Sequence, residues 1–264
     1  MRFATPRLEG ILTGRSKRFF AHCLLEGEPT LAHCVNTGSM KGVLYPPQRC
    51  LLSRATNPKR KLAYTLEALE VDGVWVGVNT HLTNTIAREA LERGLVPGLE
   101  KAVLRTEVPI LEGRIDFVAE EPGKTTYIEV KHVSLAEHGI ARFPDSPTER
   151  GQKHLRALQR LAGEGHRAIM LYMTQRDDVR GFEAASDIDP VYASLLEEAK
   201  QSGVEIYAFK CTVSPDSVEI IPSSIYGGRP LVGCSPFPSV SYAFSLPSAF
   251  SAASFFGKYL HHRV

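Results

Sequence analysis

Three charged residues form the most informative pattern in this sequence. Asp116 stands in the string RIDF, and Glu129 and Lys131 follow thirteen and fifteen residues later in YIEVK. Two carboxylates beside an ammonium group suit phosphodiester hydrolysis, because Mg²⁺ prefers carboxylate oxygens and a lysine can face the charge of the phosphate. The same pattern is typical of the solvent-facing side of a charged β-hairpin, so both interpretations stay open at this point.

The strands that hold these residues decide whether the three can meet. Strands are predicted over 114–119 and 126–133, joined by the turn at Pro122 and Gly123. Residues i and i+2 share one face of a strand, so Glu129 and Lys131 point the same way. If the two strands pair, Asp116 approaches Glu129 across the hairpin.

The neighbouring segments predict an α/β domain. A helix opens it at about Thr83, and another covers about 148–162 with Leu155, Leu158 and Leu161 on one stripe. The remaining predicted elements are strands over 104–110, 168–173 and 204–213 and a helix over 192–201. Crossover helices between strands make at least part of the sheet parallel. This element order is the arrangement of the PD-(D/E)XK nuclease-like core.

The first 80 residues have a different pattern of short β segments and close turns. Strands are predicted over 18–25, 31–35, 49–55, 62–71 and 74–78. A small OB-like barrel has the right size for this segment. The expected fold class is therefore α/β (α+β), with a barrel over 1–82, a nuclease-like domain over 83–221 and an irregular C-terminal extension over 222–264.

Charge is strongly segregated along the chain. Residues 1–61 carry 11 basic and three acidic side chains, a net charge of +8, whereas the whole chain has a net charge of only +2. A basic surface of this kind is typical of contact with nucleic-acid phosphates, although loop cations are also common on surfaces that bind nothing. The candidate nucleic-acid contacts are Arg15, Lys17, Arg18, Lys41, Lys59, Arg60, Lys61, Arg150 and Lys153. Arg150 and Lys153 lie at the expected start of a helix, where backbone N–H groups favour phosphate.

Several function classes find no support in the sequence. The N-terminal residues lack a signal-peptide core, and no stretch has the length of a membrane helix. Five cysteines without a C-x-x-C pair indicate neither a disulfide framework nor a thiolate zinc site, which favours the cytoplasm. The chain also has no P-loop, dinucleotide-binding or serine-hydrolase motif.

Six strings resemble the sugar fermentation stimulation protein (SfsA) family. They are CVNTGSM (34–40), NPKRKLAYT (57–65), VNT (78–80), GRIDF (113–117), IEVKHVSL (128–135) and FPDSPTERGQKHL (143–155). The resemblance implies an OB-like domain joined to a PD-(D/E)XK-like domain. It marks Asp116, Glu129 and Lys131 as a nuclease-like catalytic site, with Asp116, Glu129 and Glu107 as ligands of Mg²⁺ or Mn²⁺ and Glu89 as a further acid. The chain departs from the family's pattern at Gly113, at His132 and past about Ile221.

Two functions follow from these observations, and a third is weaker. The first is a protein that binds DNA without sequence preference and, by resemblance, regulates sugar metabolism of the maltose type. The second is a Mg²⁺- or Mn²⁺-dependent nuclease, so whether the chain is an enzyme stays open here. Sugar chemistry has the least support. The chain has a single tryptophan, Trp75, on which a sugar ring could stack. DNA is the expected partner, and no membrane association is expected.

Overall fold

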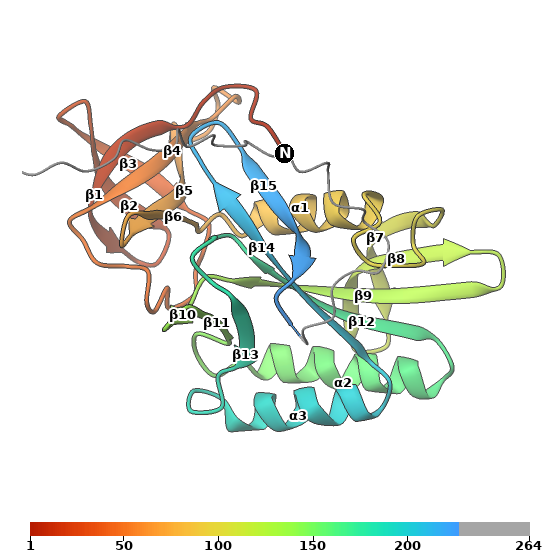
Figure 1. The fold of residues 1–264 in the computed structure, drawn as a ribbon. Helices are drawn as coiled ribbons and strands as arrows, with labels where there is room; N and C mark the ends of the chain where they lie inside the picture. Colours follow the sequence, from red (N-terminus) through yellow and green to blue (C-terminus); the bar gives the residue numbers. More distant parts are fainter. Residues whose placement is uncertain (227–264) are drawn as a thin grey trace, which may run out of the picture. The chain divides into compact units, whose positions relative to one another are not determined.

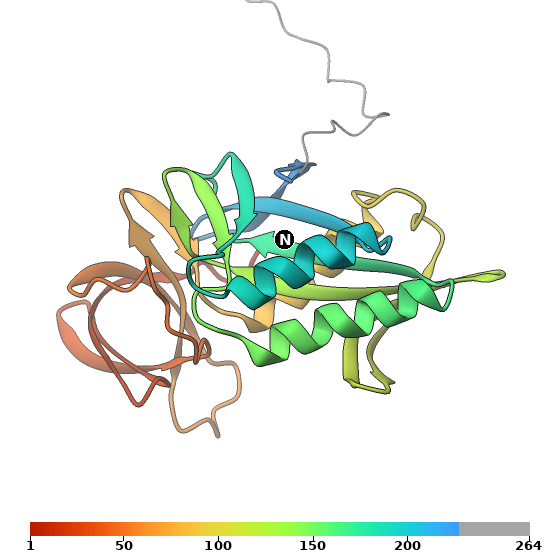
Figure 2. The same ribbon diagram turned by 90° about the horizontal axis from the view of Figure 1, so that it is seen from below.

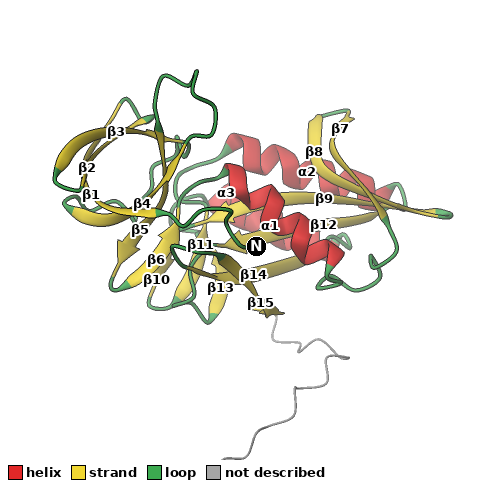
Figure 3. Cartoon of the chain, turned by 90° about the horizontal axis from the view of Figure 1, so that it is seen from above, coloured by secondary structure: helices red, strands yellow, loops and turns green. Residues whose placement is uncertain are grey.

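The computed structural model describes residues 1–226, which form a β-barrel and an α/β domain. The barrel contains β1 (Leu8–Ser16), β2 (Phe20–Leu25), β3 (Glu28–Cys34), β4 (Gln48–Arg54) and β5 (Tyr64–Val71), and β6 (Val74–Gly77) extends it beside β5. The strand order is β3-β2-β1-β4-β5-β6, and a parallel pairing of β3 with β5 closes the ring (Figure 3). The expected OB-like barrel is confirmed.

The first barrel strand, β1, was not among the predicted strands. Its sequence LEGILTGRS carries two glycines and little β-branched content, so it lacks the composition of a strand. Gly10 is needed for close packing, since a Cβ atom there would lie 2.8 Å from the carbonyl oxygen of Leu24. Inside the ring, Leu12 packs with apolar residues of the other strands, and Cys23, Cys34 and Cys50 are buried free thiols.

The α/β domain is built on a second six-stranded sheet. Its helices are α1 (His81–Glu92), α2 (Glu149–Gly163) and α3 (Pro190–Gln201). Its strands are β7 (Val103–Ile110), β8 (Gly113–Glu121), β9 (Lys124–Val133), β12 (Arg167–Thr174), β14 (Glu205–Val213) and β15 (Val218–Ser224), and a small sheet adds β10 (Ala136–Glu137), β11 (Ile140–Phe143) and β13 (Gly181–Ala184). The main order is β15-β14-β12-β9-β8-β7, with β9, β12 and β14 parallel as expected from the crossover helices.

Helices cover both faces of this sheet (Figures 1 and 2). On one face, α1 packs Ile86 and Leu91 in the same core cluster as Ile128 of β9. On the other face, α2 and α3 lie side by side, and Leu155 of α2 shares a core cluster with Met170 of β12. The strand β9 is therefore central in the sheet and buried on both sides.

Four strands of this domain, β10, β11, β13 and β15, were not predicted. Three of them have four residues or fewer, which is too short for an alternating pattern to emerge. The fourth, β15, runs to Ser224 and so takes in the start of the segment expected to be an irregular extension. From residue 227 onward, that predicted extension lies outside the described residues.

The two domains meet through residues far apart in the sequence. Asp145 accepts hydrogen bonds from the Ser39 hydroxyl (2.7 Å) and the Met40 amide (3.1 Å), so the strings CVNTGSM and FPDSPTERGQKHL lie against each other. The amide of Gly77 donates to the carbonyl of Gln175 at 2.8 Å. The barrel is thus fixed to the α/β domain at the segment between β11 and α2 and at the end of β12. No helix within residues 1–226 is long and apolar enough to cross a membrane.

Candidate active site

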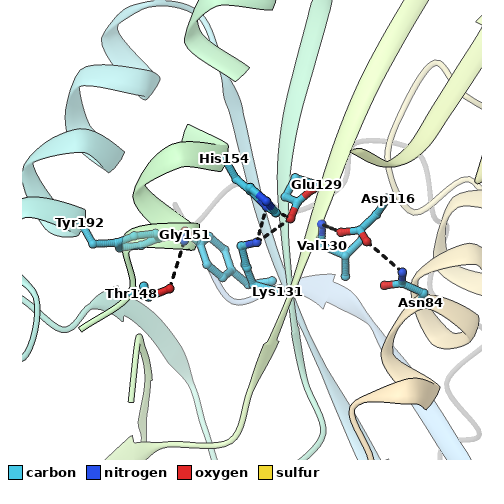
Figure 4. Close-up of polar contacts among 10 residues, drawn as sticks. Asn84, Asp116, Glu129, Val130, Lys131, Thr148, Gly151, His154 and Tyr192 are labelled. Carbon is cyan, nitrogen blue, oxygen red and sulfur yellow. Dashed lines mark hydrogen bonds and ion pairs between the residues drawn. The ribbon is translucent and has the colours of Figure 1, made fainter. Parts of the chain in front are cut away.

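Glu129 and Lys131 share one face of β9, as the strand period predicts (Figure 4). Glu129 is 2% exposed, and its Oε1 lies 2.5 Å from the Nζ of Lys131. A buried carboxylate is costly unless charged or hydrogen-bonding groups compensate it. Lys131 supplies that compensation from a position two residues along the same strand.

Asp116 reaches this pair because β8 separates from β9 at that point. The hydrogen-bonded pairing of the two strands begins at the pair Glu121 and Lys124 and ends at the pair Phe117 and Ile128. Beyond it, the Asp116 Oδ2 accepts the hydrogen bond of the Val130 amide at 2.8 Å, in place of a backbone carbonyl. The other oxygen, Oδ1, accepts from the Asn84 side chain of α1 at 3.0 Å. The predicted pairing of these two strands is therefore confirmed, and Asp116 lies beside the strand that carries Glu129.

His154 of α2 completes the cluster. Its Nδ1 lies 2.9 Å from Lys131 Nζ and in contact with Glu129 Oε1. One imidazole nitrogen can donate to the carboxylate or accept from the ammonium, but not both at once, so Nδ1 forms one of these two hydrogen bonds at a time. Thr148 caps α2 by accepting from the Gly151 amide at 3.0 Å, and this cap fixes the helix end that carries His154.

The environment separates the proton affinities of the two carboxyl groups. Burial alone would raise the pKa of Glu129, but the hydrogen bond from His154 and the charge of Lys131 outweigh it and hold that pKa below its usual value. Burial, followed by the facing charge of Glu129, raises the pKa of Asp116 to about 6. Two carboxylates that repel each other in a partly buried site form a place where a cation is stabilising.

A divalent cation fits one feature of this site directly. The Oε2 atom of Glu129 is buried and has no hydrogen-bond partner in residues 1–226, although buried carboxylate oxygens are normally satisfied. Asp116 and Glu129 are hard oxygen ligands of the type that Mg²⁺, Mn²⁺ and Ca²⁺ take. They would hold the ion between β8 and β9.

Glu107 and Glu89 lie apart from the pair in different ways. Glu107 lies on β7 at a position that has no partner in the pairing of this strand with β8; its side chain is exposed and its φ is left-handed at 52°. Within residues 1–226 no three His, Cys, Asp or Glu side chains form a group that could hold a metal ion, so Glu107 as a third ligand stays a prediction. Glu89 forms ion pairs with the amino terminus of Met1 (2.9 Å) and with Arg93 (3.2 Å).

All of the candidate nucleic-acid contacts except Arg15 are exposed, and they lie in four places. Lys17 and Arg18 occupy the turn between β1 and β2, and Lys41 follows the strand β3. Lys59, Arg60 and Lys61 lie between β4 and β5, and Arg150 and Lys153 lie in the first turns of α2. Arg15 is the exception, because its guanidinium donates to the carbonyls of Asn36 (2.6 Å) and Gly38 (3.1 Å) and so holds a barrel loop.

The sequence pattern did not place Asn84 or His154 at the site. Both could have been found from helical periodicity. His154 precedes Leu155 on the side of α2 that faces the sheet, and Asn84 shares a helix face with Ala87 and Leu91, which are buried. A polar residue on a buried helix face usually has a partner, and here the partners are Glu129 and Asp116.

Comparison with known proteins settles the family. The family description "Sugar fermentation stimulation protein RE domain" matches residues 81–217, and "SfsA N-terminal OB domain" matches residues 14–78. The chain belongs to the sugar fermentation stimulation protein family. The resemblance inferred from the six strings is therefore confirmed, and the two family domains coincide with the α/β domain and the barrel.

Individual members of the SfsA family match most of the chain. The homolog of Bdellovibrio bacteriovorus is 45% identical over 83% of this chain and 96% of its own length. The homolog of Rhodospirillum centenum is also 45% identical, over 83% and 97%. The solved structure of Pyrococcus furiosus SfsA in complex with Ca²⁺ is 28% identical, covers 84% of this chain and 94% of its own, and has a TM-score of 0.76.

Replacing Asp116 by asparagine should stabilise the metal-free protein at neutral pH. The folded pKa of about 6 lies above the unfolded value near 3.9, so wild-type stability declines as the pH rises from about 4 to above 6. Asparagine keeps an acceptor for the Val130 amide but carries no charge. We expect Asp116→Asn to be more stable by about 1–2 kcal/mol at pH 8 and by less than about 0.5 kcal/mol at pH 4. Urea denaturation in EDTA at both pH values measures this, and a variant less stable than wild type at pH 8 would contradict it.

A divalent cation should raise the melting temperature. A ligand present at about 100 times its Kd stabilises the native state by about 2.7 kcal/mol, which corresponds to roughly 5–10 °C for a chain of this size. We expect this shift with Mn²⁺, Mg²⁺ or Ca²⁺ in wild type and in the surface variant Glu120→Gln, but not in Glu129→Gln. Thermal melts with and without EDTA measure it, and equal shifts in all three proteins would show that the ion binds elsewhere.

Proposed function

We propose that this protein is a metal-dependent nuclease that hydrolyses phosphodiester bonds of nucleic acids at Asp116, Glu129 and Lys131. The observation that carries the proposal is the meeting of these three side chains at the point where β8 leaves β9, with one buried carboxylate oxygen that has no hydrogen-bond partner among the described residues. A structural hairpin would place such charges in solvent, where they need no compensation. Here Glu129 is buried, and buried carboxylates held in charged clusters are concentrated at functional sites, which supports the proposal.

Each residue has a distinct role in this proposal. Asp116 and Glu129 would hold a Mg²⁺ or Mn²⁺ ion, which supplies a Lewis acid and lowers the pKa of a bound water. Lys131 would move its Nζ from the Glu129 oxygen toward the scissile phosphate and face the charge that develops there. His154 is close enough to both groups to receive or return a proton as Lys131 changes partner. Support for a divalent ion in the family comes from the Ca²⁺ complex of Pyrococcus furiosus SfsA.

DNA binding without sequence preference is the second candidate, and it is compatible with the first. Its support is the net charge of +8 in residues 1–61 and the exposed positions of Lys59 and Lys61 on a barrel loop. Barrels of the OB type commonly bind single strands along such surfaces. A role in regulating sugar metabolism would then act through this binding, and its support is the name of the family.

Cleavage and binding should be measured in the same reaction to separate the two candidates. The substrates are single-stranded, duplex and branched DNA and RNA, each with EDTA or Mn²⁺. Cleavage that requires the ion supports the nuclease. Binding without cleavage of any substrate would overturn it and leave a nuclease-like fold that serves as a DNA-binding module.

A further inference from the structure

A basic groove of about 490 Å³ lies where the barrel meets the start of α1. Its basic lining residues are Arg7, His33, Arg54, Arg60 and His81. They come from five separate segments, namely the N-terminal residues, β3, the end of β4, the loop before β5 and the first turn of α1. Only Arg60 is among the candidate contacts that the sequence suggested, so the fold assembles this site from positions that are distant along the chain.

The floor of the groove is buried and polar. Glu67 is 7% exposed, and its Oε2 accepts from the Asn79 side chain at 2.8 Å. Its Oε1 contacts the Ser53 hydroxyl and lies 3.7 Å from Arg7 Nη2. The charge of the only carboxylate that lines the groove within residues 1–226 is therefore already compensated by Arg7 and by hydrogen bonds.

Two guanidinium groups of the groove, those of Arg54 and Arg60, have no counter-charge among residues 1–226. Arg60 donates to the Thr65 hydroxyl at 3.0 Å, which holds its guanidinium beside the groove, and neither Arg54 nor Arg60 forms an ion pair with a carboxylate in the part of the chain described. The charge of Arg60 reaches the interior of the groove, because burial and then the charges of Arg60 and His81 lower the pKa of His33. An anion bound there would relieve this repulsion.

We propose that this groove binds a phosphate monoester, the terminal phosphate of a nucleic-acid strand. A terminal phosphate carries a charge between about −1.5 and −2 at pH 7, which two free guanidinium groups match, whereas an internal phosphodiester carries a single charge. A volume of about 490 Å³ accommodates the phosphate together with the nucleoside that bears it.

The strand as the source of the phosphate rests on the proposed function and on the position of the groove. His81 begins α1, and Asn84, which binds Asp116, follows one turn later, about 4.5 Å along the helix axis. A strand anchored by its end at His81 would therefore lead along α1 toward Asp116. A free phosphate compound offers the same chemistry without the strand, and the experiment separates the two sources.

Binding of short single strands tests the inference in the full-length protein with EDTA present. Three strands of one sequence carry an internal fluorophore and either a 5′-phosphate, a 3′-phosphate or hydroxyls at both ends. We expect wild type to bind one phosphorylated strand about tenfold more tightly than the unphosphorylated strand. The double variant Arg54→Ala, Arg60→Ala should lose this preference. The control Lys124→Ala removes an exposed cation from the α/β domain, outside the candidate nucleic-acid contacts, and should keep it.

Each outcome decides one question. Equal binding of the three strands by wild type, or a preference that survives in the double variant, would overturn the inference while leaving nucleic-acid binding intact. If wild type binds no strand, nucleic-acid binding without the metal fails, the cleavage experiment still decides the nuclease, and a calorimetric titration with inorganic phosphate tests the groove separately. Phosphate binding that the double variant loses would then assign the groove to free phosphate compounds, and no binding would overturn it.

Discussion

Glu129→Gln is expected to lower the rate of Mn²⁺-dependent cleavage by at least about 1000-fold, which corresponds to about 4 kcal/mol of transition-state stabilisation. Glutamine keeps the size of the side chain but removes the charge that would hold the cation and that now pairs with Lys131 and His154. DNA binding, measured in EDTA, should change by less than about threefold, because the buried side chain does not contribute to the exposed basic surface. Single-turnover cleavage and fluorescence anisotropy on the same substrate measure the two effects.

Two companion variants test whether a folding defect, and not the loss of the site, explains this result. Asp116→Asn should abolish cleavage to a similar extent while leaving the metal-free protein at least as stable as wild type, since it removes the carboxyl group whose pKa is raised. Glu120→Gln, on the exposed part of the same strand as Asp116, should cleave at the wild-type rate. Cleavage that persists in both Glu129→Gln and Asp116→Asn would exclude this cluster as the site.

The double variant Lys59→Glu, Lys61→Glu is expected to bind DNA at least about tenfold more weakly at physiological salt and with an equal loss for every sequence. Each phosphate contact that is lost lowers the magnitude of the negative slope of log K against log salt concentration by about 0.9, so this magnitude should fall by about two. Both side chains are exposed on the loop between β4 and β5, so the fold should not change. Anisotropy titrations at several salt concentrations measure affinity and slope together.

A matched control changes the net charge by the same amount elsewhere. Lys101 and Lys124 are exposed lysines of the α/β domain, and Lys101→Glu, Lys124→Glu should weaken binding much less. An equal loss in both double variants would mean that net charge alone governs binding. An unchanged affinity in the barrel variant would remove this loop from the binding surface.

The sequence by itself was sufficient to predict the barrel, the α/β domain and the pairing of the two strands that carry the site. Alternation along 126–133 put Glu129 and Lys131 on one face, and the Pro122-Gly123 turn indicated the hairpin. These features depend on local periodicity and turn chemistry, which residues close together in the sequence determine. The short strands β10, β11 and β13 escaped prediction because their pairings, and not their own few residues, define them.

Only the tertiary structure decided what surrounds those three charges. The separation of β8 from β9 lets Asp116 accept the Val130 amide, and the packing of α1 and α2 brings Asn84 and His154 to the two carboxylates. The groove with Arg54 and His81 likewise arises from segments that only the closed barrel and α1 bring together. Contacts of this kind depend on how whole elements pack, and the cost of burying a charge such as Glu129 becomes visible only when its surroundings are known.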